Sequence, residues 1–420
     1  MQPGETLFSV SARYGVPLSR LAAENGLRAD SALAVGQALV ILTAAETHTV
    51  AAGETVTDIA TAYGNTVRQL YRNNPILQGV PLLYPGQTLV IRFTDTPTTP
   101  LQTSSYAYPY IPPEQLRSIL PFLTYLAPFT YGFTPSGQLV ELDDAFLVNS
   151  ARDYGTLPLM HVSTLTEEGV FSNALSSAVL SDPAAGDVLI GEIVRTVEEK
   201  GYAGADVDFE FILPEDALAY GAFLERLHTA LAANDRLLFS ALAPKTSADQ
   251  PGLLYQGHNY AAVGAAVDYV LLMTYEWGYT YGPPMPVAPL PNVRRVVDYA
   301  LTEIPAAKIF LGAPNYGYDW TLPYVQGESR ATSISPLRAV EIAVRYGAEI
   351  LYDEVAQSPY FYYSDEMGRE HVVWFEDPRS IRARLALPTE YGLPGVGFWD
   401  AMRPATNNFM VLNALYRIVE

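Results

Sequence analysis

Residues Gly204–Glu210 read GADVDFE, and this short stretch decides the fold. Side chains on a β-strand alternate between its two faces, so Asp206, Asp208 and Glu210 share one face while the apolar residues between them share the other. In a closed parallel barrel, the apolar face packs against the surrounding helices and the acidic face points inward. The acids then climb toward the C-terminal rim, where such barrels carry their active sites.

The chain around this strand alternates apolar runs with amphipathic stretches of helical period, which favours an α/β fold. Eight apolar runs are predicted strands: Tyr106–Ile111, Leu123–Thr130, Leu157–Val162, Ala205–Phe209, Leu237–Ala243, Tyr269–Thr274, Ile309–Ala313 and Val396–Trp399. Eight strands separated by helices indicate a TIM (β/α)8 barrel over residues 106–420. The surplus length fits an insertion at about residues 321–380, between the seventh and eighth strands.

The acidic face of the fourth strand predicts acid catalysis. Three carboxylates this close in a semi-enclosed site cannot all ionise, so at least one holds a proton near neutral pH. Glu210 lies nearest the rim and is the natural proton donor. Two other interpretations stay open: a surface strand with solvated acids, and an oxygen-rich site for Mg²⁺ or Ca²⁺ built from Asp206, Asp208 and Glu210. We expect no cofactor and no metal.

The N-terminal part contains an internal repeat. Gly4-Glu5-Thr6 recurs as Gly53-Glu54-Thr55, and the closing run Leu39-Val40-Ile41 recurs as Leu89-Val90-Ile91. Capping residues, helical spacing and turns predict a small βααβ unit in each copy. The first unit spans residues 1–43 and has almost no opening strand, the second spans 47–93, and the Thr- and Pro-rich residues 94–105 are predicted to be a linker.

Composition excludes several classes of protein. The net charge of −20 argues against nucleic-acid and anionic-membrane partners, which need basic surfaces. The absence of cysteine excludes disulfides and thiolate metal sites. The histidines have no ligand-type spacing, which argues against zinc; they are His48, His161, His228, His258 and His371. The N-terminus has neither a basic nor an apolar signal region, so no secretory signal is expected.

The carboxylate strand resembles the signature of glycoside hydrolase family 18, Asp-Gly-x-Asp-x-Asp-x-Glu, except that Ala203 stands where the family has its leading Asp. A second family pattern, Met-x-Tyr-Asp, appears as Met273-Thr-Tyr275-Glu276, with Glu in place of Asp. The family's tryptophan on the eighth strand appears as Trp399. The resemblance extends over roughly residues 106–420.

This resemblance implies retaining hydrolysis assisted by the substrate's own acetamido group. Glu210 would protonate the leaving oxygen, Asp208 would hold the acetamido N–H, and Asp206 would share a proton with Asp208. Tyr275 would bind the acetamido oxygen, and Trp399 would form the floor under the sugar at the −1 position. Further substrate contacts are expected from Met273, Glu276, Asn315 and Tyr316, with core packing as the alternative for Met273, Asn315 and Tyr316.

The two repeats resemble LysM domains, which bind N-acetylglucosamine glycans such as peptidoglycan and chitin. The resemblance implies a sugar groove at Gly53, Thr55, Asn74 and Pro75, and at the equivalent positions of the first unit. Ordinary turn chemistry is the alternative explanation of each of these residues.

The order of two LysM units and this barrel resembles bacterial spore cortex-lytic N-acetylglucosaminidases. That implies a substrate of cortex peptidoglycan, and a protein made in the mother-cell cytoplasm and held in the spore coat or cortex, or otherwise at the cell wall. Two alternatives stay open: a chitinase or chitooligosaccharide hydrolase, and a non-catalytic glycan-binding protein of the spore coat. The intact Glu210 argues against the second.

Overall fold

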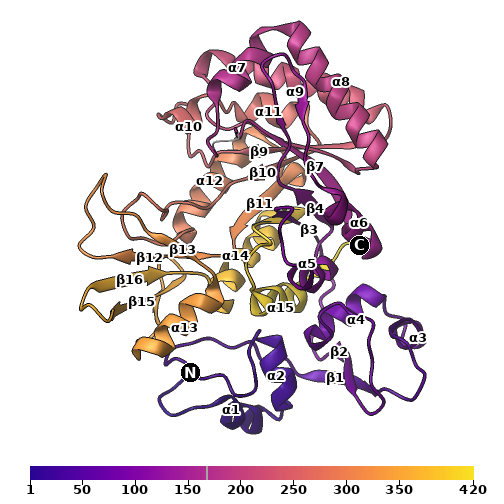
Figure 1. Cartoon of the computed structure of the whole chain (residues 1–420), viewed down its shortest axis with the longest axis vertical. Coiled ribbons are helices and arrows are strands. Elements are labelled where there is room, and N and C mark those ends of the chain that lie inside the picture. The colour runs from indigo at the N-terminus through magenta and orange to yellow at the C-terminus, as the bar shows by residue number, and fades with distance from the viewer. Residues whose placement is uncertain (167–168) are drawn as a thin grey trace.

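The computed structural model describes residues 1–166 and 169–420. Its centre is a closed barrel of parallel strands, in which each strand pairs with the next in chain order and the last pairs with the first (Figure 1). The barrel strands are β3 (Pro100–Ala107), β4 (Tyr125–Pro128), β7 (Leu157–Ser163), β8 (Gly204–Asp208), β9 (Leu237–Leu242), β10 (Tyr269–Leu272), β11 (Ile309–Pro314) and β17 (Gly395–Trp399). The predicted TIM barrel is therefore confirmed.

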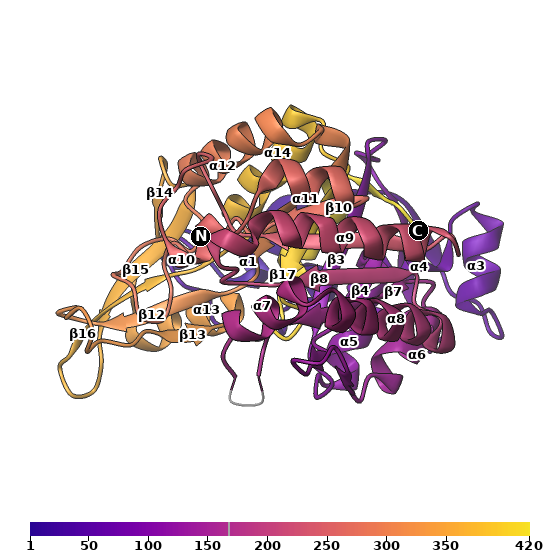
Figure 2. The ribbon, with the colours of Figure 1, turned by 90° about the horizontal axis from the view of Figure 1, so that it is seen from above.

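Helices follow each barrel strand and lie around the barrel (Figure 2). They are α5 (Pro113–Ile119), α6 (Ala145–Asp153), α7 (Asn173–Ser181), α8 (Pro183–Lys200), α9 (Ala217–Ala232), α10 (Leu253–Gln256), α11 (Tyr260–Ala266), α12 (Leu290–Glu303), α14 (Pro378–Tyr391) and α15 (Thr406–Leu415). Small strands β5 (Gly132–Phe133) and β6 (Leu139–Val140) form a hairpin after β4, and β18 (Arg417–Ile418) pairs with β3. Within the described residues, no helix combines the length and apolar character needed to cross a membrane.

The first barrel strand begins earlier than the sequence predicts. β3 starts at Pro100, so the second half of the expected linker 94–105 is barrel, and its residues pair with β4 and β17. Thr103 and Ser105 are fully buried there, and their hydroxyls donate to the carbonyls of Phe122 and Phe398. Because their hydroxyls bond to neighbouring backbone carbonyls, small polar side chains can be buried in this strand. Its composition therefore resembles that of a linker.

An inserted layer lies between β11 and α14. It is an antiparallel sheet of β12 (Gly317–Thr321), β13 (Thr332–Ile334), β14 (Leu351–Asp353), β15 (Ser358–Ser364) and β16 (Glu370–Trp374), with helix α13 (Pro336–Tyr346). Figure 1 places this sheet beside the barrel. It begins with the residues that follow β11 directly, so its first strand can carry side chains to the barrel's C-terminal rim.

The two N-terminal units differ in their completeness. The second has the expected βααβ order: β1 (Ala44–Thr49), α3 (Val56–Ala62), α4 (Val67–Asn73) and β2 (Thr88–Phe93), with β1 and β2 antiparallel. The first has helices α1 (Leu7–Tyr14) and α2 (Leu18–Glu24), and residues 1–43, all of which the structure describes, contain no named strand. Its small core is closed by Leu7, Val10 and Leu21.

Both units are docked onto the barrel and its insertion rather than tethered at a distance (Figure 1). Arg72 of α4 is 2% exposed, donates to the carbonyl of Pro121 at 2.8 Å and pairs with Glu420 at 2.6 Å. The first unit joins the insertion, since the backbone N–H of Ile350 donates to the carbonyl of Val35 at 2.9 Å. Buried charged groups with specific partners fix relative orientation, so the two N-terminal units and the barrel form one packed body.

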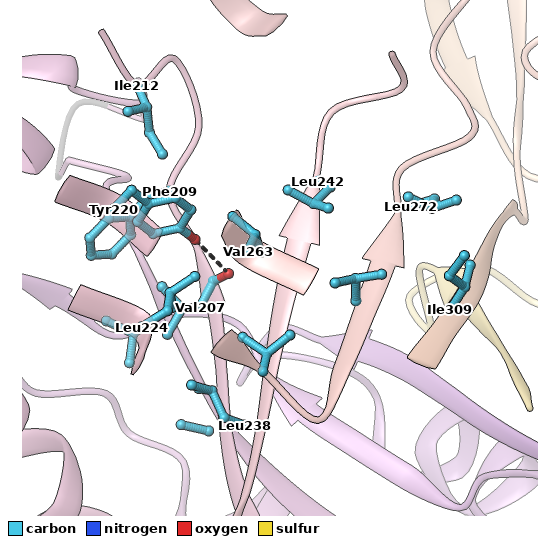
Figure 3. Close-up of a cluster of buried hydrophobic side chains, with 14 of the residues drawn as sticks. Val207, Phe209, Ile212, Tyr220, Leu224, Leu238, Leu242, Val263, Leu272 and Ile309 are labelled. Atoms are coloured by element: carbon cyan, nitrogen blue, oxygen red, sulfur yellow. Dashed lines mark hydrogen bonds between the residues drawn. The ribbon is translucent and has the colours of Figure 1, made fainter. Parts of the chain in front are cut away.

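The apolar side chains of β8 anchor this strand to the helices around the barrel. Val207 and Phe209 are fully buried against Tyr220 and Leu224 of α9 (Figure 3). The hydroxyl of Tyr220 also donates to the carbonyl of Val207 at 3.5 Å (Figure 3). With the apolar residues packed outward, Asp206 and Asp208 point into the barrel as the alternation predicts.

Candidate active site

The two aspartates of β8 lie deep in the barrel. Asp206 is 3% exposed and Asp208 is 6% exposed. The hydroxyl of Tyr106, at the end of β3, donates to Oδ2 of Asp206 at 2.8 Å. Burial is the largest cause of a raised pKa at Asp206, and the nearby charge of Asp208 adds to it. Asp206 therefore favours its protonated form more than an exposed aspartate does.

Glu210 follows the end of β8 and lines a cleft of about 570 Å³ at the C-terminal ends of the strands. The cleft is lined by Tyr106, Tyr108, Phe129, Leu165, Gly169, Phe171, Asp208, Glu210, Ala241, Pro244, Leu254, Tyr255, Met273, Tyr275, Glu276, Trp277 and Trp399. Aromatic rings dominate this wall, which suits the apolar faces of sugar rings. The cleft brings the predicted acid, two further carboxylates and the predicted sugar-binding aromatics together.

The pKa of Glu210 is raised well above its ordinary value. Burial is the largest cause, followed by the negative charges of Asp208 and Glu276. Each of these disfavours the carboxylate form, so Glu210 stays protonated at a pH where an exposed glutamate is ionised. A proton kept on a carboxyl group beside an open cleft is what general acid catalysis requires.

Tyr275 is 9% exposed and lines the same cleft. Burial and then the charge of Asp208 raise its pKa well above the usual value, so its hydroxyl remains a donor. Gly312 of β11 makes room for the ring, since a Cβ at this glycine would lie 2.9 Å from Cε1 of Tyr275 and 2.3 Å from a neighbouring carbonyl oxygen. The position of Tyr275 therefore depends on a glycine in the next strand.

Glu276 is held by tyrosines from the insertion. Tyr316 donates to its Oε1 at 2.5 Å, and Tyr318 donates to both carboxylate oxygens at 2.9 and 3.1 Å. The backbone of Glu276 is left-handed, with φ of 66°, which aims its side chain into the cleft. The two hydroxyl donors therefore fix the carboxylate of Glu276 at the wall of the cleft.

The structure places the remaining predicted contacts in two groups. Met273 and Trp399 line the cleft. Asn315 and Tyr316 do not: Asn315 is 1% exposed and bonds to Asn408 and to the carbonyl of Arg403, while Tyr316 lies behind Glu276. The prediction that Asn315 and Tyr316 line the pocket is therefore corrected, because both side chains are used to support neighbouring residues.

The predicted sugar groove of the second LysM unit is also only partly supported. Asn74 is 4% exposed, and its side chain bonds to the backbone of Leu70 and Val90 with three hydrogen bonds, so no polar atom remains for a glycan. Thr55 caps helix α3. Gly53 is exposed in a turn with φ of 88°, and Pro75 lies beside the cavity between the LysM units and the barrel. Asn74 is a structural residue, which corrects its assignment as a sugar contact.

Several residues of the site are missed by the sequence interpretation. Tyr106 and Phe129 come from the ends of β3 and β4, Phe171 and Trp277 come from loops above the barrel, and Tyr255 comes from the short helix α10. Four of them lie after or near the C-terminal end of a predicted strand, whereas Tyr106 is predicted to begin its strand and in fact lies near the end of β3. Exact strand ends would have been needed to find them. His161, set aside as a scattered histidine, lies beside Asp208.

A parallel barrel that carries a glutamic acid of raised pKa, two buried aspartates and an aromatic cleft is the arrangement of a glycosidase. The chain belongs to the glycosyl hydrolases family 18, whose family model matches residues 167–403. The LysM domain model matches residues 2–42 and 48–92.

Relatives and solved structures extend the match over the whole chain. The cortical fragment-lytic enzyme of Bacillus anthracis is 36% identical over 419 residues, covering 98% of this chain and 96% of that protein. The cortical fragment-lytic enzyme of Bacillus subtilis (strain 168) is 40% identical over 304 residues, covering 72% and 70%. The crystal structure of the Bacillus cereus spore cortex-lytic enzyme SleL superposes with a TM-score of 0.84 at 34% identity, covering 100% of this chain and 97% of that one.

Proposed function

We propose that this protein is a spore cortex peptidoglycan N-acetylglucosaminidase, which hydrolyses the glycosidic bond after N-acetylglucosamine with retention of configuration. The observation that carries the proposal is Glu210, a carboxyl group with a raised pKa that lines the same aromatic cleft as Asp208. The choice of polymer is supported by the likeness to cortical fragment-lytic enzymes over nearly the full chain.

The chemistry follows from the order of the side chains. Glu210 donates its proton to the glycosidic oxygen as the bond to the anomeric carbon breaks. The carbonyl oxygen of the substrate's acetamido group attacks that carbon from the opposite face, giving an oxazolinium-like intermediate. Asp208 accepts a hydrogen bond from the acetamido N–H, and the hydroxyl of Tyr275 donates to the acetamido oxygen. Glu210, now a carboxylate, takes a proton from the water that opens the intermediate.

The remaining cleft residues bind the sugar. Trp399 lies beside Tyr106 and Phe129, with ring centroids 5.4 and 5.0 Å away, and would stack under the sugar at the −1 position. Glu276 would accept a hydrogen bond from a sugar hydroxyl, since both of its oxygens are already oriented by tyrosines. Met273 would close the apolar side of the acetamido pocket.

The LysM units would hold the enzyme on the same glycan that it cuts. Gly53 and the cap turn at Thr55 form an exposed edge at the start of α3, which suits backbone contacts to N-acetylglucosamine. With such binding, the protein would reside in the spore, at the coat or cortex. A peptidoglycan or chitin-like glycan is the partner expected for these units.

Mass spectrometry of fragments released from purified cortex tests the proposal. The protein should yield fragments with N-acetylglucosamine at the new reducing end, whereas Glu210→Gln should yield none. Digestion of chitin oligomers in parallel separates cortex hydrolysis from chitinase activity. Faster cleavage of chitin than of cortex would favour a chitinase. NMR of the first product should show the β-anomer, and an inverted product would exclude participation of the acetamido group.

A further inference from the structure

His161 is a buried histidine that no step above uses. It lies on β7 in register with Asp206 of β8 and is fully buried inside the barrel. Its ring stacks on Phe129 at 4.7 Å and meets the ring of Tyr106 edge-on at 5.2 Å. Its Nδ1 lies 2.7 Å from the hydroxyl of Thr130, which fixes the ring's rotation.

The other ring nitrogen faces the aspartate pair. Nε2 of His161 lies 3.7 Å from Oδ2 of Asp208, slightly beyond hydrogen-bond distance. Nε2 is buried, as are Oδ1 of Asp206 and Oδ1 of Asp208, and none of the three has a hydrogen-bond partner among the described residues. Leaving buried polar atoms unpaired costs free energy, and a leucine or phenylalanine would fill this space without that cost. Polarity at this position therefore needs a functional reason.

The proposed reaction supplies that reason. When one oxygen of Asp208 accepts the acetamido N–H of the substrate, the other oxygen is left on the barrel side, where the imidazole lies. A small rotation of Asp208 brings that oxygen within hydrogen-bond distance of Nε2. We propose that His161 is a positioning residue, which donates its Nε2 hydrogen to Asp208 and holds that carboxylate turned toward the acetamido group. This inference rests on the proposed function.

The charges around the imidazole agree with this role. Tyr106, Asp206 and Asp208 lie next to it, and the charge of Asp208 also acts on Glu210 and Tyr275. Burial raises the pKa of Asp206, and the charge of His161 opposes that rise. Removing the imidazole should therefore move the titration of Asp206 to higher pH, and with it the acidic limb of the pH profile of kcat/KM.

Two substitutions at His161 test the proposal. His161→Leu keeps the volume and removes the donor; we expect kcat on cortical fragments to fall about 10- to 100-fold with little change in KM, the range for one hydrogen bond to a charged group. His161→Gln keeps an N–H donor and should recover part of kcat. Both should move the acidic limb to higher pH. Thr130→Val leaves the imidazole intact but removes the partner of Nδ1. It should therefore cause part of the fall in kcat that His161→Leu causes.

The control is His228→Gln, since His228 lies on the outer helix α9 beside Asp268 and should leave kcat and the pH profile unchanged. The proposal is overturned if His161→Leu keeps the wild-type kcat and acidic limb, or if Leu and Gln lose kcat equally without moving that limb. If a His161 variant does not fold, an unchanged kcat in Thr130→Val overturns it. NMR of protein with ¹³C-labelled aspartate can follow the same titration without substrate. Because this measurement does not depend on hydrolysis, it separates failure of this inference from failure of the proposed function.

Discussion

Glu210→Gln is expected to remove catalysis and to stabilise the fold, and the second effect should grow with pH. Glutamine has nearly the same shape but no acidic proton, and general acid catalysis contributes about 10²- to 10⁴-fold. We therefore expect kcat on cortical fragments to fall at least about 10³-fold while KM changes little. The side chain of Glu210 lines the cleft and the substitution keeps its shape, so the effect on kcat is chemical rather than structural.

The stability effect follows from the raised pKa of Glu210. Burial, Asp208 and Glu276 raise it in the folded state, so above the unfolded pKa of about 4.3 the folded protein binds more protons than the unfolded chain. Stability from this group therefore falls as pH rises toward the folded pKa, at about 1.4 kcal/mol per unit of pKa shift. Glutamine does not titrate, so the variant escapes this loss.

Thermal unfolding between pH 4 and pH 8 measures the difference. The melting temperatures of the variant and the wild type should coincide near pH 4, and the variant should melt higher at pH 8, by roughly 2 °C for each kcal/mol. The control is Glu215→Gln, an exposed acid on the short helix after β8, which should change neither turnover nor the pH dependence of melting. A melting difference that is constant across this range, or larger at pH 4, would refute the raised pKa of Glu210.

Three further substitutions probe the supports of the site. Gly312→Ala should cost about 1–3 kcal/mol of stability and lower kcat, because the new Cβ meets the ring of Tyr275 and a carbonyl oxygen; thermal unfolding and kinetics check this, and an unchanged kcat would contradict it. Tyr316→Phe removes one donor from Glu276 and should lower kcat/KM about tenfold while leaving the melting temperature nearly unchanged. Asn74→Ala should destabilise the second LysM unit by about 2–4 kcal/mol and weaken binding to cortex sacculi, with hydrolysis of short fragments preserved.

The carboxylate strand could be predicted from sequence because its information is local. A period of two, with Val207 and Phe209 between acids, fixes which side chains face inward once a barrel is assumed. The first barrel strand could not be placed because its buried residues are polar. Thr103 and Ser105 are satisfied by backbone carbonyls that come from other parts of the chain, and no local pattern reports such partners.

The same distinction explains the site. Tyr275 and Trp399 follow from short patterns at strand ends, and both line the cleft. Tyr316 was expected at the cleft wall, but it reaches Glu276 from behind, which depends on how the inserted sheet packs. His161 carries no pattern of its own, since only the closure of the barrel brings it to Asp208.

If the LysM units bind the glycan as proposed, their docking on the barrel limits where the enzyme can cut. Arg72 donates a hydrogen bond to the carbonyl of Pro121, and the first unit is hydrogen-bonded to the insertion. A glycan-binding site on these units and the catalytic cleft would therefore keep a constant separation. An enzyme on a flexible tether could reach many bonds around its anchor, whereas this one, anchored as proposed, would have to release and rebind to reach the next bond. With a constant separation between anchor and cleft, soluble wall fragments would bring their bonds to the cleft more readily than an intact, cross-linked wall.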